Sequence, residues 1–231
     1  MIDPFINPAH VQGSPEWLEN RRNYIGASDA GVILGLSPWK TPYQLWLEKL
    51  GRGEESNQTF AMLKGTQLEP FARSSFERDL GLDVFPDCVY HPEHDFMMAS
   101  LDGITLDRNI VVELKSGLST YKMAKEAIIP EYYKAQLQHQ LACIGLNEIY
   151  YYSYDEQTDS GICIKVYRDD EYIKKLIDKE KEFWVFVTSK NPPPLTDRDY
   201  ENKDDDPLWV ESSSRLKQID VLLKSLKKEN G

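Results

Sequence analysis

Hydrophobic residues recur along this chain with two different periods, and the change from one to the other predicts an α/β fold. A period of about 3.6 residues is typical of amphipathic helices, and it marks residues 42–50, 60–80, 119–129, 131–145, 169–190 and 215–226. Short runs rich in β-branched and aromatic residues predict strands at 84–90, 95–99, 148–154 and 161–167, and a hairpin over 100–115. Because helical segments precede and follow the strands, we expect a central mixed sheet flanked by helices.

The hairpin over 100–115 contains the most suggestive cluster of charges. Its polar turn, 107–109, separates a strand with Asp102 at its start from an apolar strand that ends on Glu113, Leu114 and Lys115. Side chains alternate along a strand, so Glu113 and Lys115 share a face. If Asp102 lies across from Glu113, two carboxylates and an ammonium converge, and such a group can hold a hard divalent cation beside a reacting water.

The N-terminal region offers a candidate anion site. Ser14 followed by Pro15 predicts a capped helix start, and Arg21 follows on the same short helix. Small residues over 25–31, including Ser28, predict the start of another helix, whose first amides can bind an anion. Two interpretations remain open from these residues: a phosphate pocket, or a capped helix pair with an exposed arginine.

Two predicted helices contain polar residues whose roles the local pattern leaves open. Gln136 and Gln140 lie four residues apart beside an apolar stripe, which is consistent with hydrogen bonding or with a merely polar shoulder. His139 is expected at the surface. Glu69 lies in the 60–80 segment next to Pro70, which predicts a kink or a fresh helix start. A single helix glutamate is usually solvated, so its context predicts no role.

Composition narrows the class of protein. With 41% hydrophobic residues, the 231-residue chain can bury a sizeable core. The net charge of −11 argues against nucleic acid as a partner, although the carboxylates of a metal-dependent nuclease contribute to that surplus. Three cysteines without CxxC spacing argue against a disulfide framework and structural zinc. Without a signal peptide or membrane span, we expect a cytoplasmic protein.

These separate features belong to a series of motifs that resembles a known protein family along most of the chain. Six short motifs occur in order: Trp17-x-x-x-Arg21, Ile25-Gly-Ala-Ser28, Gly65-Thr-Gln-Leu-Glu69, Ser100-Leu-Asp-Gly103, Glu113-Leu-Lys115 and Tyr133-Lys-Ala-Gln136-Leu-Gln-His-Gln140. Together they resemble the YqaJ-type viral recombinases, the family of the phage lambda exonuclease within the PD-(D/E)xK nuclease superfamily. The resemblance covers residues 14–190, and it departs from the pattern where Leu101 replaces the proline before Asp102.

The resemblance implies a restriction-endonuclease-like core and a role for each matched residue. Asp102, Glu113 and the backbone carbonyl of Leu114 would hold Mg²⁺, with Mn²⁺ tolerated. Lys115 would orient or activate the attacking water or stabilise charge on phosphorus. The remaining assignments are Glu69 assisting the metal site, Gln136 near the water, Gln140 and Tyr133 supporting these residues from behind, and Arg21, Ser28 and Ser100 binding a 5′-terminal phosphate.

The implied activity is a 5′→3′ exonuclease acting on double-stranded DNA ends, which releases 5′-mononucleotides and leaves 3′ single strands for annealing-type recombination. The implied assembly is a toroidal homotrimer with a possible single-strand annealing partner and no membrane, in a bacterial host or encoded by a prophage. A repair or restriction-type endonuclease and a non-catalytic DNA-end-binding module are the alternatives. We expect one exonuclease domain over 1–194, followed by an acidic linker and a C-terminal amphipathic helix over 195–231.

Overall fold

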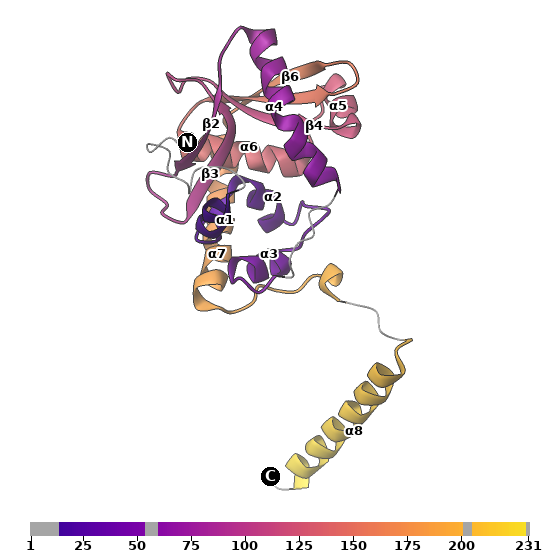
Figure 1. The fold of residues 1–231 in the computed structure, drawn as a ribbon. Coiled ribbons are helices and arrows are strands. Elements are labelled where there is room, and N and C mark those ends of the chain that lie inside the picture. The colour runs from indigo at the N-terminus through magenta and orange to yellow at the C-terminus, as the bar shows by residue number, and fades with distance from the viewer. Residues whose placement is uncertain (1–13, 54–59, 201–204, 230–231) are drawn as a thin grey trace. The chain divides into compact units, whose positions relative to one another are not determined.

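The computed structural model describes residues 14–53, 60–200 and 205–229 (Figure 1). The chain divides into two compact units, residues 1–194 and residues 195–231. The predicted functional residues all lie in the first unit, so its architecture determines how they are placed.

The core of the first unit is a six-stranded mixed sheet. Its strands are ordered β1-β3-β4-β5-β6, with β2 paired to β3 alone among the described strands. The pairs β1–β3 and β4–β5 are parallel, and the other pairs are antiparallel. The bounds are β1 Ile25–Gly26, β2 Phe85–Tyr90, β3 Met97–Ile104, β4 Val111–Ser116, β5 Glu148–Asp155 and β6 Ser160–Tyr167. The edge position of β2 agrees with Pro86, which cannot donate a ladder hydrogen bond.

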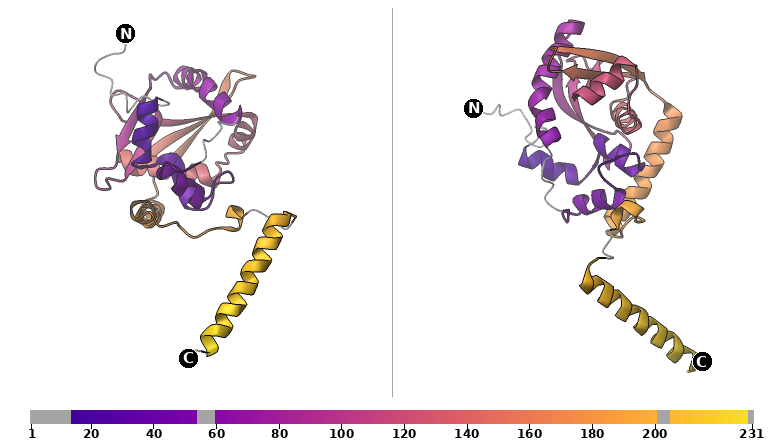
Figure 2. Two further views of the ribbon diagram at one scale, coloured as in Figure 1. Left: turned by 60° about the horizontal axis from the view of Figure 1, so that its bottom comes forward. Right: turned by 90° about the vertical axis from the view of Figure 1, so that its right-hand side faces the viewer.

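Helices cover both faces of this sheet (Figures 1 and 2). The bounds are α1 Pro15–Arg22, η2 Ala27–Asp29, α2 Ala30–Ile33, α3 Pro42–Lys49, α4 Phe60–Leu80, α5 Leu118–Lys125, α6 Glu131–Ile144 and α7 Asp170–Ser189. Successive side chains of a strand point to opposite faces of the sheet, so the core has two layers, one on each face. Val111 and Tyr151 pack with residues of α6 and α7, whereas Val112 and Tyr152 pack with Phe76 of α4 on the opposite face. The predicted α/β fold is confirmed.

Local signals explain several helix starts. The Ser14 side chain accepts a hydrogen bond from the amide of Trp17, which caps α1. Thr41 and Gln44 form a reciprocal capping box at the start of α3. Asp169 caps α7 through the amide of Tyr172. These polar caps satisfy amides that have no partner within their own helix.

Some element boundaries differ from the sequence-based expectation. The segments 95–99 and 100–104 belong to one strand, β3, so Asp102 lies inside a strand rather than at its start. α4 continues through Pro70 as a single helix. The helix expected over 119–129 ends at Lys125, because Ala127 has a φ of 56° that no right-handed helix accommodates.

The second unit contains η3, Asp197–Asp199, and a longer helix, α8, Pro207–Glu229. α8 begins eight residues before the helix expected over 215–226, so the segment predicted as a linker is partly helical. Residues 201–204 of that segment lie outside the described residues. Across both units, the described helices are too short or too polar to cross a bilayer.

Candidate active site

The sheet register brings Asp102 and Glu113 together. β3 and β4 pair through Gly103 and Val112, and one more step in this antiparallel register places Asp102 opposite Glu113. At this position the Asp102 side chain bonds to the backbone of the neighbouring strand: its Oδ2 accepts a hydrogen bond of 2.9 Å from the amide of Leu114. Burial and the neighbouring charge of Glu113 raise the pKa of Asp102 well above its usual range. Two carboxylates therefore face each other in a water-poor region.

Glu113 is surrounded by hydrogen-bond donors from two elements. Its side chain is 2% exposed. Its Oε1 accepts from the ammonium of Lys115 and, at 2.5 Å, from the amide nitrogen of Gln136, and its Oε2 accepts from the amide nitrogen of Gln140. Gln136 and Gln140 share one face of α6 because they lie one helical turn apart. Of the two interpretations of these glutamines, the structure shows hydrogen bonding.

Lys115 is held as a cation beside the carboxylates. Its ammonium contacts Glu113 and lies 4.8 Å from the ring centroid of Tyr133. Burial alone lowers the pKa of Lys115, but Glu113 and Asp102 outweigh it and raise that pKa above its ordinary value. A lysine held in its charged form donates hydrogen bonds and stabilises negative charge; it is poorly suited to accept a proton.

Glu69 reaches this cluster through an arginine. The Arg73 guanidinium bonds the Glu69 carboxylate at 2.6 Å, and its Nε donates to the backbone carbonyl of Asp102 at 3.0 Å. Sequence reasoning did not single out Arg73, although its position four residues after Glu69 on α4 is the spacing at which helical side chains meet. The role of Glu69 at a metal stays a prediction.

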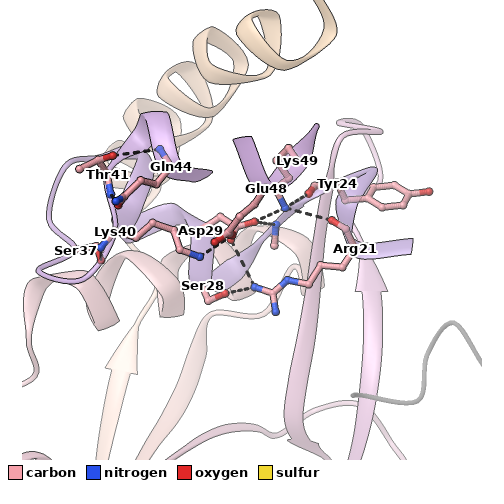
Figure 3. Close-up of polar contacts among 11 residues, drawn as sticks. Arg21, Tyr24, Ser28, Asp29, Ser37, Lys40, Thr41, Gln44, Glu48 and Lys49 are labelled. Carbon is pink, nitrogen blue, oxygen red and sulfur yellow. Dashed lines mark hydrogen bonds and ion pairs between the residues drawn. The ribbon is translucent and has the colours of Figure 1, made fainter. Parts of the chain in front are cut away.

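A second cluster surrounds Arg21 and Ser28 (Figure 3). Arg21 donates to the Ser28 hydroxyl, and its guanidinium lies 5.1 Å from the ring centroid of Trp17. The Arg21 side chain is partly exposed, at 30% of its surface. A partly exposed arginine at the end of α1 and a serine in η2 are suited to bind a phosphate.

A buried ion pair supports this second cluster from behind (Figure 3). Lys49 lies 2.7 Å from Oδ2 of Asp29, and its ammonium also donates to the backbone carbonyls of Arg21 and Tyr24 at 3.2 and 2.6 Å. Asp29 Oδ2 accepts from the Gly26 amide at 2.9 Å. Burial would raise the pKa of Asp29, but Lys49 and Arg21 outweigh it and hold that pKa far below its usual range.

Ser100 connects the two clusters. Its hydroxyl accepts a hydrogen bond of 3.1 Å from the Trp17 indole, which packs against Arg21. Its backbone carbonyl accepts a hydrogen bond of 3.4 Å from Gln140, which also bonds Glu113. Residues predicted for phosphate binding and for metal binding therefore belong to one connected network centred on β3.

The residues present fit a hard divalent cation. Carboxylate and carbonyl oxygens are the ligands that Mg²⁺ prefers, and Asp102, Glu113 and the Leu114 carbonyl would supply them. Gln140 Oε1 is buried and lacks a hydrogen-bond partner among the described residues, so the site has an additional oxygen ready to accept from a bound water. Among the described residues no group of three or more acids, histidines or cysteines is close enough to hold a metal, which leaves the backbone carbonyl as the third oxygen.

The expectation that His139 lies at the surface is wrong. His139 is 0% exposed, and its ring nitrogens lie 2.8 Å from the Glu180 carboxylate and 2.9 Å from the backbone carbonyl of Met98. Through these contacts His139, the residue before Gln140, joins α6 to α7 and β3. The expectation failed because a polar residue on a helix is usually solvated. The partners that bury His139 come from remote parts of the chain.

Comparisons with known proteins agree with this geometry. Residues 16–147 match the YqaJ-like viral recombinase domain. A Bacillus subtilis protein described as uncharacterized protein YqaJ is 36% identical over 177 residues, which cover 73% of this chain and 54% of that protein. The chain therefore spans about half the length of this curated relative.

Solved structures share the fold. The alkaline exonuclease LHK-Exo from Laribacter hongkongensis matches with a TM-score of 0.67 and 25% identity, covering 77% of this chain and 94% of that one. Its complex with dAMP gives the same TM-score at 26% identity. A phage related exonuclease from Haemophilus somnus 129PT, at 15% identity and a TM-score of 0.56, supports the fold alone. The predicted restriction-endonuclease-like fold is confirmed. The family match over residues 16–147 covers more than half of this chain. The chain therefore belongs to the YqaJ-like viral recombinase domain family.

Proposed function

We propose that this protein is a Mg²⁺-dependent 5′→3′ exonuclease that degrades one strand of a DNA duplex from its end and releases 5′-mononucleotides. The observation that supports it most is the connection, through Ser100, of a carboxylate–lysine cluster to a separate Arg21–Ser28 cluster. A phosphodiester held at the first cluster and a terminal phosphate held at the second would give an enzyme that starts at ends. The relative described as an alkaline exonuclease, solved also with dAMP, supports the same conclusion.

Each residue has a physical role in this reaction. Asp102, Glu113 and the Leu114 carbonyl would hold the cation, which polarises the phosphodiester and lowers the pKa of a bound water. The Lys115 ammonium stabilises the negative charge that develops on the phosphoryl oxygens. Gln136 and Gln140 fix the orientation of Glu113 by bonding its two oxygens. Arg21 and Ser28 bind the 5′-phosphate at the end of the shortened strand.

The proposed activity also implies a biological role and an assembly, which are part of the same proposal. A 3′ single strand left by the enzyme is the substrate of a single-strand annealing protein, so we infer a role in phage-type recombination within a bacterial cytoplasm. A toroidal homotrimer would retain the remaining strand between rounds of cleavage. The surplus of negative charge on the chain would keep duplex DNA from binding elsewhere on the surface.

The test is release of acid-soluble nucleotides from 5′-phosphorylated linear duplex with and without Mg²⁺. We expect release with Mg²⁺ alone, and at least about a hundredfold slower release by Lys115→Ala, because the loss of one charge-stabilising donor typically costs about that much. Lys165→Ala is the matched control, since Lys165 is exposed on β6, where its ammonium pairs with Glu148 and lies 5.2 Å from the Tyr150 ring centroid. Equal rates for Lys115→Ala and the wild type would reject the proposal, and cleavage of a covalently closed circle would point to an endonuclease.

A further inference from the structure

Trp39 is exposed beside the candidate active site. It lies in the loop between α2 and α3 with 67% of its surface accessible, although large aromatic residues are usually buried. Among the described aromatic rings, the Trp39 ring packs in a T-shaped arrangement with Tyr132, at a centroid distance of 4.9 Å and an interplanar angle of 78°. One face of a large aromatic ring is therefore available to a ligand.

A row of aromatic contacts leads from Trp39 to the catalytic lysine. The Tyr132 ring lies 4.4 Å from the Tyr133 ring, centroid to centroid. The Tyr133 ring in turn has the Lys115 ammonium 4.8 Å from its centroid. Tyr132 and Tyr133 are on the first turn of α6, the helix that presents Gln136 and Gln140 to Glu113. Trp39 is thus at the outer end of a continuous contact path that begins at the scissile site.

The loop that presents Trp39 is held in place at both ends. The Ser37 hydroxyl accepts the backbone amides of Trp39 and Lys40, each at 3.3 Å. The ammonium of Lys40 pairs with Glu48 of α3 at 2.6 Å, and the capping box at Thr41 fixes the following helix start (Figure 3). The exposed ring is therefore preorganised, and its use by a ligand costs little conformational entropy.

The same loop is anchored to the catalytic helix. Leu36 and Ser37 donate their backbone amides to the carbonyl of Gly31 at 2.8 and 3.0 Å. A Cβ at Gly31 would lie 2.9 Å from the carbonyl oxygen of Tyr132, so glycine permits α2 and α6 to pack backbone against backbone. The position of Trp39 relative to Gln136 is thereby fixed by the main chain.

We propose that Trp39, supported by its T-shaped contact with Tyr132, is a stacking platform for a nucleobase at the DNA end. This inference rests on the proposed nuclease function and adds a base-binding subsite to it. Every base offers a π face, so an aromatic platform grips DNA without reading its sequence, as an exonuclease that degrades any sequence requires. Stacking would hold the terminal base pair at the mouth of the site, where the strand to be cut leaves the duplex.

The test measures binding of a duplex end in EDTA, where cleavage stops. The probes are 5′-phosphorylated duplexes that place a single abasic residue at each of the last three nucleotides of either strand in turn. Loss of one base–aromatic stack typically weakens binding by about five- to one-hundredfold. We expect Trp39→Ala to show a loss of this size on intact ends, Trp39→Phe to recover most of it, and the effect of Trp39→Ala to disappear on one member of the abasic series.

Trp209→Ala is the matched control, since Trp209 is also exposed but belongs to α8 of the second unit; it should leave binding unchanged. Thermal unfolding of each variant checks that the fold is retained.

An unchanged affinity for Trp39→Ala, or an equal loss on every abasic duplex, overturns the proposal that Trp39 is a stacking platform. A lower solution mass for Trp39→Ala with an equal loss on all ends assigns the ring to an interface between copies and also overturns it. A wild-type protein that releases no nucleotides with Mg²⁺ refutes the nuclease function itself, whereas normal release without the abasic-specific effect refutes only the platform.

Discussion

Asp102 Oδ2 accepts a hydrogen bond from the backbone amide of Leu114 at 2.9 Å. The amide and carbonyl of one residue in a strand point toward the same neighbouring strand. The carbonyl of Leu114 is therefore expected to face Asp102 as well, which is how a backbone oxygen would join two carboxylates in the proposed ligand set. The bond uses one oxygen of Asp102 and leaves the other for a cation.

Asp102→Asn is expected to abolish metal binding without harming the fold. Burial and Glu113 raise the pKa of Asp102, so ionising this acid costs folding free energy once the pH exceeds its unfolded pKa of about 3.9. At pH 7 without metal, the neutral variant should unfold at a temperature equal to or above that of the wild type. Addition of Mg²⁺ should raise the wild-type Tm, because a ligand of the native state stabilises it, and should leave the variant unchanged. An equal rise in both proteins would contradict the assignment.

Gln140→Met is expected to weaken metal binding more than it weakens the fold. The change keeps the side-chain volume but removes the donor to Glu113 Oε2, so the carboxylate is no longer fixed on that side. Loss of a residue that orients a metal ligand typically costs about 10- to 100-fold in metal affinity or activity. The measurement is the Mg²⁺ concentration for half-maximal nucleotide release. Gln138→Met is the control, because Gln138 lies on the same helix but bonds the backbone at Tyr167 and Asp169. A similar Mg²⁺ requirement in both variants would count against the role of Gln140.

The Asp29–Lys49 pair is expected to position Arg21 for the 5′-phosphate. Asp29→Asn alone leaves a buried ammonium without its counter-charge and should destabilise the protein by about 3–5 kcal/mol. Asp29→Asn with Lys49→Met removes both charges and should recover most of that loss, yet it frees the carbonyls of Arg21 and Tyr24 and so loosens the end of α1. The readout is the ratio of initial rates on 5′-phosphorylated and 5′-hydroxyl duplexes, which should fall in the double variant.

A second charge pair on α3 provides the comparison for that ratio. Lys40→Met with Glu48→Gln removes an ion pair whose side chains are about one third exposed, so its contribution to stability is small, about 0–1 kcal/mol. In the described part of the chain, neither Lys40 nor Glu48 forms a hydrogen bond or ion pair with Arg21, so the ratio should stay at the wild-type value. A ratio that falls equally in both double variants would mean that α3 acts only through general stability.

His139 and Glu180 are expected to make stability depend on pH. Burial lowers the pKa of His139, but the carboxylate of Glu180 outweighs it and raises the pKa well above the ordinary value of about 6.5. The stability from this charged pair is therefore complete below about pH 6.5 and is lost as the pH rises through the raised pKa. His139→Gln should destabilise most at pH 6, and its difference from the wild type should shrink toward pH 9. Denaturant unfolding at both pH values measures this, and a constant difference would show that His139 is not charged in the folded protein.

Much of the site could be predicted because its signals are local. The polar turn at 107–109 and the alternation after it place Glu113 and Lys115 on one face, and the register then brings Asp102 opposite Glu113. The spacing of Gln136 and Gln140 is likewise local, since one helical turn separates them. What the pattern left open for these glutamines was their partner, which lies more than twenty residues earlier in the chain.

Other parts of the site depend on tertiary packing and left no signal in a short window. Asp29 and Lys49 lie twenty residues apart and meet only because α3 packs against the end of α1. His139 lies 41 residues from each of its partners, so its polarity suggested solvent when its environment is a fully buried ion pair. Arg73 is the exception, since its spacing from Glu69 could have been noticed on the helix.

The close contact between Gly31 and Tyr132 affects how the protein would measure a DNA strand. α2 follows the turn that contains Ser28, and α6 contains Gln136, so the separation of these two side chains depends on how closely the two backbones approach. A methyl group at position 31 would force that separation to increase. In the proposed enzyme, the length of DNA between the bound terminal phosphate and the bond to be cut would therefore be set by main-chain packing, and product length would depend on this contact.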